Sequence, residues 1–194
     1  MSKGELTKQA VLEEATTIAA RLGLEGLTIG SLATSMNMSK SGLFGHFRSK
    51  EALQLQVLAH ARENFTHLVL RPALAAPRGE PRLQVMLDRW LDLGLTFAAG
   101  CLFVSAATEF DDREGPVREQ LVHDHQDMLD SVAQMFRAGV SEGTFRADAD
   151  AEQFAHDVNG VMLGFYHAFR LLRDPLAETR ARRAFDTLLN NARP

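Results

Sequence analysis

The sequence contains few of the residues that define several common classes of protein. Of its 194 residues, one is cysteine, one is tryptophan, one is tyrosine and six are proline. A single cysteine excludes an intramolecular disulfide framework and is typical of a reducing compartment. Because prolines are few and 45% of the residues are hydrophobic, helices around a packed core can occupy most of the chain.

Long apolar runs are also missing. No run reaches the ~18 residues that a transmembrane helix needs. The N-terminal sequence MSKGELTKQAVLEEA is polar and lacks the apolar core of a signal peptide. We therefore expect a cytoplasmic protein without a membrane partner.

Motifs for catalysis are missing as well. The chain has no glycine-rich phosphate loop, no G-x-S-x-G sequence, no His/Cys cluster with metal-ligand spacing and no pair of carboxylates at a catalytic spacing. We expect no enzyme activity, no bound metal and no cofactor. An active site can also be assembled from distant residues, so an enzyme stays open as an alternative.

The net charge of −4 is distributed unevenly. Residues 1–50 contain six lysines and arginines and four glutamates, whereas the remainder contains 15 basic and 21 acidic residues. A mildly basic N-terminal segment on an acidic body is suited to contact phosphates at one end of the molecule.

The segment from Thr28 to Leu53, TIGSLATSMNMSKSGLFGHFRSKEAL, is the most informative. Its first part has apolar residues at the spacing of one helix face, namely Ile29, Leu32, Ala33 and Met36. Asn37 and Met38 end that helix, and Ser39 can cap the next one. The second helix has an apolar side (Leu43, Phe44 and Phe47) and a small, polar or basic side (Lys40, Ser41, Gly42, Gly45 and His46). This pattern is typical of a helix-turn-helix that enters a DNA major groove.

The remaining periodicity predicts an all-α protein of about nine helices. An N-terminal three-helix DNA-binding domain spans residues 1–50, and a C-terminal helical domain spans residues 51–194. Helices are expected over about 6–22, from Thr28, from Ser39, from Ser49 to just before Pro72, from Pro81, over about 102–110, over about 116–141, from Asp150 and from Asp174. Residues 71–81 hold three prolines and are expected to form a loop.

The segment from Val158 to Leu172, VNGVMLGFYHAFRLL, is apolar on nearly every side. Such a helix must be buried on two sides, and the second side is most simply a partner subunit. We predict a homodimer in which the last two helices pair with their two-fold mates. The predicted interface residues are Val161, Phe165, Phe169, Phe185 and Leu188.

Over roughly residues 6–58 the chain resembles the tetracycline-repressor (TetR-like) family of bacterial regulators. The resemblance is carried by Thr28-Ile29, Leu32-Ala33, Ser39-Lys40, Leu43-Phe44-x-His46-Phe47 and Ser49-Lys50-Glu51-x-Leu53. It implies a homodimer in which each subunit has an N-terminal DNA-reading head and a C-terminal ligand-sensing body. A small molecule bound in the body would release the dimer from its operator. Two positions depart from the family pattern, since Ser41 replaces a usual glycine and Phe44 replaces a tyrosine whose hydroxyl reaches a phosphate.

The predicted DNA contacts all lie in the N-terminal DNA-reading head, residues 1–50. Lys40 and Ser41 are predicted to read base edges, with Gly42 permitting close approach of the backbone; the alternative is a solvated surface turn. His46 and Lys50 are predicted to clamp phosphates. The other predicted DNA-binding residues are Thr28, Ser39 and Phe44. Thr28 can also be a plain helix cap, and His46 can also be a packing residue. Phe44 is either a core residue or a contact to a thymine methyl group or a sugar.

The body holds the predicted effector site. The candidates are large or polar side chains on inward-facing stripes: Trp90, Phe97, Phe103, Phe110, His125, Phe165 and Tyr166. His125 interrupts an apolar stripe, and it is either a ligand contact or a core histidine with a neighbouring partner. Cys101 is either a buried thiol or a redox sensor, which would need exposure and a lowered pKa.

The leading hypothesis is a ligand-responsive transcriptional regulator, a repressor released from a palindromic operator by a small molecule. Its expected partners are double-stranded operator DNA, an effector of unknown identity and a second copy of the chain. The alternative is a helical interaction module or small-molecule-binding protein that does not bind DNA.

Overall fold

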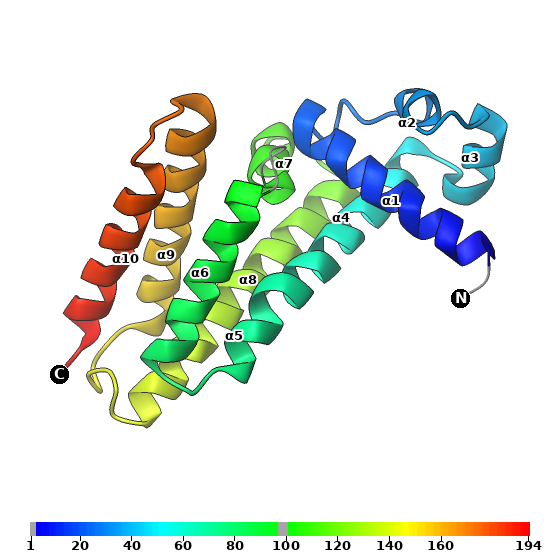
Figure 1. Cartoon of the computed structure of the whole chain (residues 1–194). Helices are drawn as coiled ribbons and strands as arrows, with labels where there is room; N and C mark the ends of the chain where they lie inside the picture. Colours follow the sequence, from blue (N-terminus) through cyan, green and yellow to red (C-terminus); the bar gives the residue numbers. More distant parts are fainter. Residues whose placement is uncertain (1–2, 97–100) are drawn as a thin grey trace. The chain divides into compact units, whose positions relative to one another are not determined.

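The computed structural model describes residues 3–96 and 101–194, apart from the side chains of residues 3–7 and of Phe44. All regular elements in this part are helices (Figure 1). They are α1 (Lys3–Leu22), α2 (Ile29–Ser35), α3 (Lys40–Phe47), α4 (Lys50–Phe65), η1 (Thr66–Leu70), α5 (Arg71–Ala75), α6 (Glu80–Thr96), α7 (Leu102–Phe110), α8 (Pro116–Ser141), α9 (Ala151–Tyr166), η2 (His167–Leu171) and α10 (Ala177–Ala192). The predicted all-α class is confirmed.

Two of these helices contain a wider π-helical turn. The elements α4, η1 and α5 follow one another without a break, and η2 directly continues α9. Counted as continuous helices, the described part therefore has nine. The prediction of a loop over 71–81 was wrong at its start. Helix continues through Pro72 to Ala75 because the preceding turn is π-helical, with the Arg71 N–H bonded to the Thr66 carbonyl.

Two further helix starts were predicted. The Asp150 carboxylate accepts a 2.9 Å bond from the Gln153 N–H, which confirms Asp150 as the cap of α9. The last helix begins at Ala177, later than expected. The Asp174 carboxylate accepts a bond from the Leu176 N–H and holds a turn ahead of the helix.

The described residues form two compact units. The first contains residues 3–64 and 101–124, and the second contains residues 65–96 and 125–194. The boundaries fall inside the α4–η1–α5 helix and inside α8. The predicted functional division at residues 50 and 51 stays a prediction.

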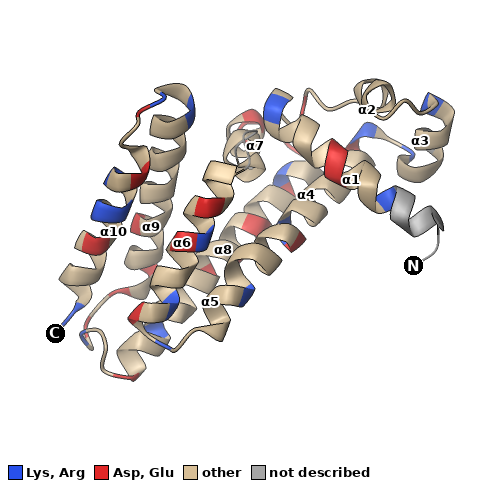
Figure 2. Cartoon of the chain, in the orientation of Figure 1, with Lys and Arg blue, Asp and Glu red and all other residues tan. Residues whose placement is uncertain are grey.

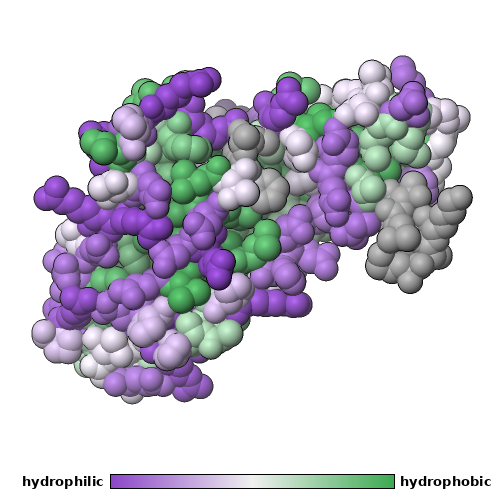
Figure 3. All heavy atoms as spheres, in the orientation of Figure 1, coloured by the Kyte–Doolittle hydropathy of each residue, from purple (hydrophilic) through white to green (hydrophobic). Residues whose placement is uncertain are grey.

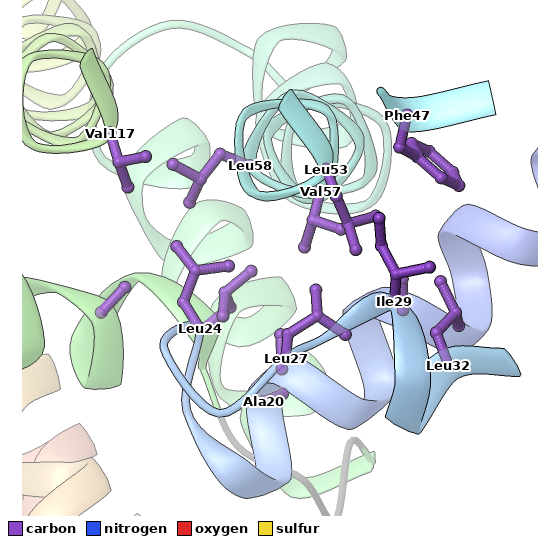
Figure 4. Close-up of a cluster of buried hydrophobic side chains, with 14 of the residues drawn as sticks. Ala20, Leu24, Leu27, Ile29, Leu32, Phe47, Leu53, Val57, Leu58 and Val117 are labelled. Carbon is purple, nitrogen blue, oxygen red and sulfur yellow. The ribbon is translucent and has the colours of Figure 1, made fainter. Parts of the chain in front are cut away.

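The first unit is built around apolar side chains from α1, α2, α3, α4, α7 and α8. Figure 4 shows Leu24, Leu58 and Val117 meeting on one side of this core, while Ile29 and Leu32 lie on the other. Leu43 and Phe47 anchor α3 in the same core and are almost fully buried. The helix-turn-helix therefore has a fixed inner face, which leaves its opposite face to the solvent.

The second unit is held by phenylalanine rings. Phe136 stacks on Phe145, with ring centroids 4.5 Å apart, and on Phe154 at 4.3 Å. Phe154 in turn meets the ring of Phe185 edge-on at 6.2 Å. These contacts tie α8, α9 and α10 into one core.

Candidate nucleic-acid interface and effector site

The N-terminus of α2 is fixed by its own side chains. The Thr28 hydroxyl accepts a 3.0 Å bond from the Ser31 N–H, and the Ser31 hydroxyl accepts a 3.0 Å bond from the Thr28 N–H. This reciprocal pair is a capping box. Thr28 is exposed, and its hydroxyl serves as the helix cap while also donating to the Ser31 hydroxyl at 3.1 Å.

The turn between α2 and α3 is tight. Asn37 adopts a φ of 53°, a left-handed conformation that asparagine tolerates better than most residues. The Met38 N–H bonds back to the Ala33 carbonyl at 2.9 Å. The Ser39 hydroxyl then accepts a bond from the Gly42 N–H at 3.2 Å, which confirms Ser39 as the cap of α3.

The outer side of α3 is small, polar and free of acidic residues. Lys40, Ser41, Gly42, Gly45 and His46 are all exposed. Neither α2 nor α3 contains an aspartate or glutamate, and Figure 2 shows no red on either helix. This face can approach a polyanion without repulsion from a carboxylate of its own helices.

Lys40 reaches back over the first turn of α2. Its Nζ lies 3.7 Å from the position that a Cβ on Gly30 would take, and the Thr28 hydroxyl lies 3.6 Å from the same point. The structure therefore gathers two of the predicted DNA-binding residues, Thr28 and Lys40, at one helix N-terminus. An ammonium group, a hydroxyl and a helix N-terminus together favour an anion.

Lys50, a predicted phosphate clamp, pairs with Glu25 in this structure. Its Nζ donates to the Glu25 carbonyl at 2.6 Å and to Glu25 Oε1 at 2.8 Å. The hydrogen bond from Lys50 lowers the pKa of the Glu25 carboxyl below its ordinary value, the charges of Lys50 and Arg113 act in the same direction, and partial burial opposes them. The Lys50 charge is thus used to join the start of α4 to the turn after α1.

A carboxylate from α7 closes the same turn. Glu109 accepts hydrogen bonds from the Leu24 N–H at 3.2 Å and from the Glu25 N–H at 2.8 Å. Arg113 Nη1 lies 3.0 Å from Glu25 Oε2, and the Arg113 guanidinium lies 5.2 Å from the centre of the Phe110 ring. The turn that precedes the helix-turn-helix is therefore held from both α4 and α7.

Sequence reasoning missed Glu109 and Arg48. Glu109 contacts residues that lie 84 and 85 positions earlier in the chain, so no local sequence pattern predicts these contacts. Arg48 is exposed between α3 and α4 with a φ of 59°. An exposed arginine next to a helix-turn-helix is a local signal for a phosphate contact.

Comparisons with known proteins agree with this geometry. Residues 11–57 match the family model described as "Bacterial regulatory proteins, tetR family", and residues 79–185 match "Tetracyclin repressor-like, C-terminal domain". The second match covers more than half of the chain. The chain belongs to the TetR family. Members of this family are DNA-binding transcriptional regulators and not enzymes. They act as homodimers and respond to small molecules. This chain is such a regulator.

Solved structures share the fold along almost the whole length of this TetR-family chain. A TetR regulator from Chloroflexus aurantiacus is 22% identical, with a TM-score of 0.86 and coverage of 98% of this chain and 96% of that one. A TetR-family regulator from Cytophaga hutchinsonii is 18% identical, with a TM-score of 0.88 and coverage of 100% and 98%. AibR, solved with isovaleryl coenzyme A and operator DNA, is 22% identical, with a TM-score of 0.75 and coverage of 93% and 97%. No curated protein sequence matches the chain.

Three of the predicted effector residues of this TetR-family regulator lie in the second unit around Gly94 of α6. The rings of Phe165 and Tyr166 pack so closely that a Cβ on Gly94 would lie 2.8 Å and 3.0 Å from their Cε1 atoms. Trp90, one helical turn earlier, is buried and meets the ring of Phe65 edge-on at 5.3 Å. No acceptor in the described part of the chain bonds the buried Trp90 Nε1. This N–H is a polar group inside an aromatic wall that a ligand with an acceptor atom would satisfy.

The other predicted effector residues lie elsewhere. Phe110 is buried in the core of the first unit, and Phe103 packs against that core. His125 is half-buried on α8 in the second unit. Phe97 lies outside the described residues. So does the side chain of Phe44, which is a predicted DNA contact. Cys101 is half-buried at the start of α7.

The predicted dimer residues divide into two groups. Phe165 and Phe185 are already buried within their own chain, whereas Val161, Phe169 and Leu188 are half-buried. Four leucine side chains of α9 and of the segment that joins it to α10 are 45–70% exposed, namely Leu163, Leu171, Leu172 and Leu176. Figure 3 shows hydrophobic surface at the tip where α9 and α10 are joined.

The described residues provide neither a metal site nor a membrane span. Within residues 3–96 and 101–194, no three His, Cys, Asp or Glu side chains are grouped so that they could hold a metal ion. In the same ranges no helix combines the length and the apolar character needed to cross a bilayer.

Proposed function

We propose that this TetR-family chain is a cytoplasmic repressor that binds a palindromic operator as a dimer and is released by a small molecule. The exposed face of α3 carries this proposal, because it is small, polar and free of acidic residues while its inner side is locked into a core. Two such helices, one from each subunit, would enter successive major grooves about 34 Å apart.

The roles within the head follow from exposure and pairing. Lys40 and Ser41 contact base edges, and Gly42 allows the backbone to approach. Thr28 and His46, both exposed, contact phosphates, and Ser39 holds the start of α3 through its bond to the Gly42 N–H. The role proposed for Phe44, a contact to a sugar or a thymine methyl group, rests on the sequence alone.

Two further residues of the head have assigned roles. Arg48 is added to the phosphate contacts because it is exposed beside α3. Lys50 is assigned instead to positioning the head, because both of its hydrogen bonds go to Glu25.

The effector binds in the second unit beside Trp90, Phe165 and Tyr166, and it supplies an acceptor to the Trp90 Nε1–H. Trp90 is the single tryptophan of the chain, so its fluorescence reports on this place. AibR was solved with an acyl-coenzyme A and with operator DNA, which makes a ligand with an acyl group and several acceptor oxygens a reasonable first class to screen. Phe103, Phe110 and His125 are less favoured, and His125 is kept as a packing residue.

The dimer forms through α9 and α10. Its contact surface includes Leu163 together with Val161, Phe169 and Leu188, because these side chains keep surface that a partner can cover. Gly160 and Gly164 are exposed, and a Cβ at either would meet no atom within 4 Å. The partner's backbone can therefore approach α9 closely at this place.

The test is selection of bound fragments from the source genome, followed by fluorescence anisotropy of a selected duplex at several salt concentrations. A repressor head binds at low salt and loses affinity steeply as salt rises. The effector should then lower DNA affinity while sedimentation still shows a dimer. Absence of any binding at low salt would favour an interaction module, and monomers on effector addition would contradict the proposed release.

A further inference from the structure

A cavity of about 250 Å³ lies in the second unit, apart from Trp90 and Gly94. It is formed between η1 and α5 on one side, the start of α6, and the C-terminal half of α8. Its lining combines two arginines, Arg78 and Arg82, with apolar side chains that include Leu70, Leu74 and Met135. The lining contains no aspartate or glutamate.

Arg82 is held in place by backbone carbonyls. Its Nη2 donates to the Leu74 and Ala76 carbonyls at 3.0 Å each, and its Nε lies 3.3 Å from the Ala76 carbonyl. These bonds satisfy the C-terminal end of α5 and fix the plane of the guanidinium. No acceptor in the described part of the chain bonds its Nη1. A guanidinium that is already oriented loses little freedom when it binds an anion.

Arg78 is the more mobile of the two charges. Its only acceptor among the described residues is Glu142, at 3.4 Å, and both side chains are well exposed. Such an ion pair contributes little to stability. A carboxylate that entered the cavity could therefore compete with Glu142 for Arg78 without a large loss.

The rest of the cavity wall is mainly apolar, with Leu70, Leu74, Met135 and Ala138 beside the polar Ser131 and Gln134. Leu74 is 54% exposed, although it is a leucine, and it lines the cavity together with Leu70 and Met135. A hydrocarbon group placed against this wall would cover exposed apolar surface, which is favourable in water. The cavity thus combines guanidinium groups, which suit an anion, with apolar side chains, which suit a short apolar body.

We propose that this cavity binds a small amphipathic carboxylate, with its head on Arg78 and Arg82 and its hydrocarbon part against Leu70, Leu74 and Met135. The volume limits the ligand to a short acyl or aromatic group, because typical drug-sized ligands occupy pockets of about 300–1,000 Å³. This ligand site is separate from the one assigned to the effector, and it does not depend on DNA binding.

The test is isothermal titration of the full-length chain with sodium octanoate, with 1-octanol as the neutral analogue. One octanoate should bind per chain, and octanol should bind at least about tenfold more weakly because it lacks the charge. Arg78→Gln should weaken octanoate binding about tenfold, because it removes a charge-assisted hydrogen bond. Leu74→Glu should weaken it at least as much, because it places a negative charge on the cavity wall.

Matched variants outside the cavity serve as controls. Arg89→Gln changes the net charge as Arg78→Gln does, and Leu68→Glu changes another exposed leucine, 41% exposed, as Leu74→Glu does. Both controls should leave the octanoate affinity unchanged. Because all four substituted side chains are exposed, the variants should fold. Equal binding of octanoate and octanol, no saturable binding, or equal effects of cavity and control variants would each overturn the proposal.

Discussion

The carboxylate of Glu109 occupies the space that a side chain on Gly23 would need. Gly23 follows α1 with a φ of +86°, a conformation that residues with a Cβ rarely adopt. This open position lets Glu109 reach the N–H groups of Leu24 and Glu25. A glycine near the N-terminus and a glutamate at the end of α7 are thus two halves of one contact.

Gly23→Ala should therefore destabilise the protein. The change forces a Cβ into the left-handed region and against the Glu109 carboxylate, and we expect a cost of about 1–3 kcal/mol in the free energy of unfolding. Chemical denaturation followed by circular dichroism measures it. Gly45→Ala is the control, because its Cβ would meet no atom within 4 Å and it lies inside a helix, where alanine is favoured. Equal stabilities of the two variants would contradict the contact.

Glu109→Ala should open the turn after α1. The substitution leaves the Leu24 and Glu25 N–H groups without their acceptor. A hydrogen bond to a charged acceptor typically contributes about 1.5–3 kcal/mol to the free energy of unfolding. Hydrogen exchange at these two amides should accelerate. Glu114→Ala removes an exposed carboxylate nearby and should leave the same amides unchanged. Unaltered exchange in Glu109→Ala would show that the turn does not depend on α7.

The ion pair of Glu25 predicts a pH dependence. The pKa of Glu25 is lowered in the folded protein, first by the hydrogen bond from Lys50. A lowered pKa gives stability that is present above the unfolded value of about 4.5 and is lost as pH falls through the folded value. Because the pair is partly exposed, we expect less than about 1 kcal/mol. Unfolding free energies at pH 7 and in acid should differ less for Glu25→Gln than for the natural protein; an equal difference would reject this assignment.

The two lysines of the head should respond differently to substitution. Lys40→Ala should weaken binding to a selected duplex and reduce the slope of log K against log salt by about 1, because its ammonium lies beside the N-terminus of α2, a place that favours a phosphate. Lys50→Ala should leave that slope unchanged, because its ammonium is bound to Glu25. Anisotropy titrations at several salt concentrations compare them. A larger slope change for Lys50→Ala would restore the phosphate role expected from the sequence.

Trp90→Phe should cost little stability although it shortens a buried side chain. The substitution loses packing contacts, but it also removes a buried N–H that has no acceptor among the described residues, and these two effects oppose each other. We expect the free energy of unfolding to change by less than about 1 kcal/mol. Leu87→Ala on the same helix is also buried but releases no unpaired group, and it should cost about 2–5 kcal/mol. Thermal and chemical unfolding compare the two. A loss above about 3 kcal/mol in Trp90→Phe would mean that the N–H is satisfied in solution.

Local signals in the sequence were sufficient for much of the fold. The helix from Pro116 to Ser141 was predicted at its observed bounds, because proline favours the first turn and the apolar stripe is long. The caps at Thr28 and Ser39 were also found, since each depends on residues within three positions. The helix through Pro72 was missed because a π-helical turn has no clear sequence pattern.

The candidate site was less predictable, because its pairings are long-range. The exposed face of α3 could be inferred from periodicity alone. The commitment of Lys50 to Glu25, the reach of Glu109 from α7 and the placement of Arg78 and Arg82 at one cavity depend on tertiary packing. No spacing rule within one helix encodes such contacts.

The central claim is that two copies of α3 contact successive major grooves of DNA. Hydroxyl-radical footprinting of a selected duplex with the dimer tests it directly. The account predicts two protected patches related by two-fold symmetry and centred about 10 base pairs apart, or a small multiple of that distance. A single patch, or no protection at a concentration where the protein is dimeric, would contradict it.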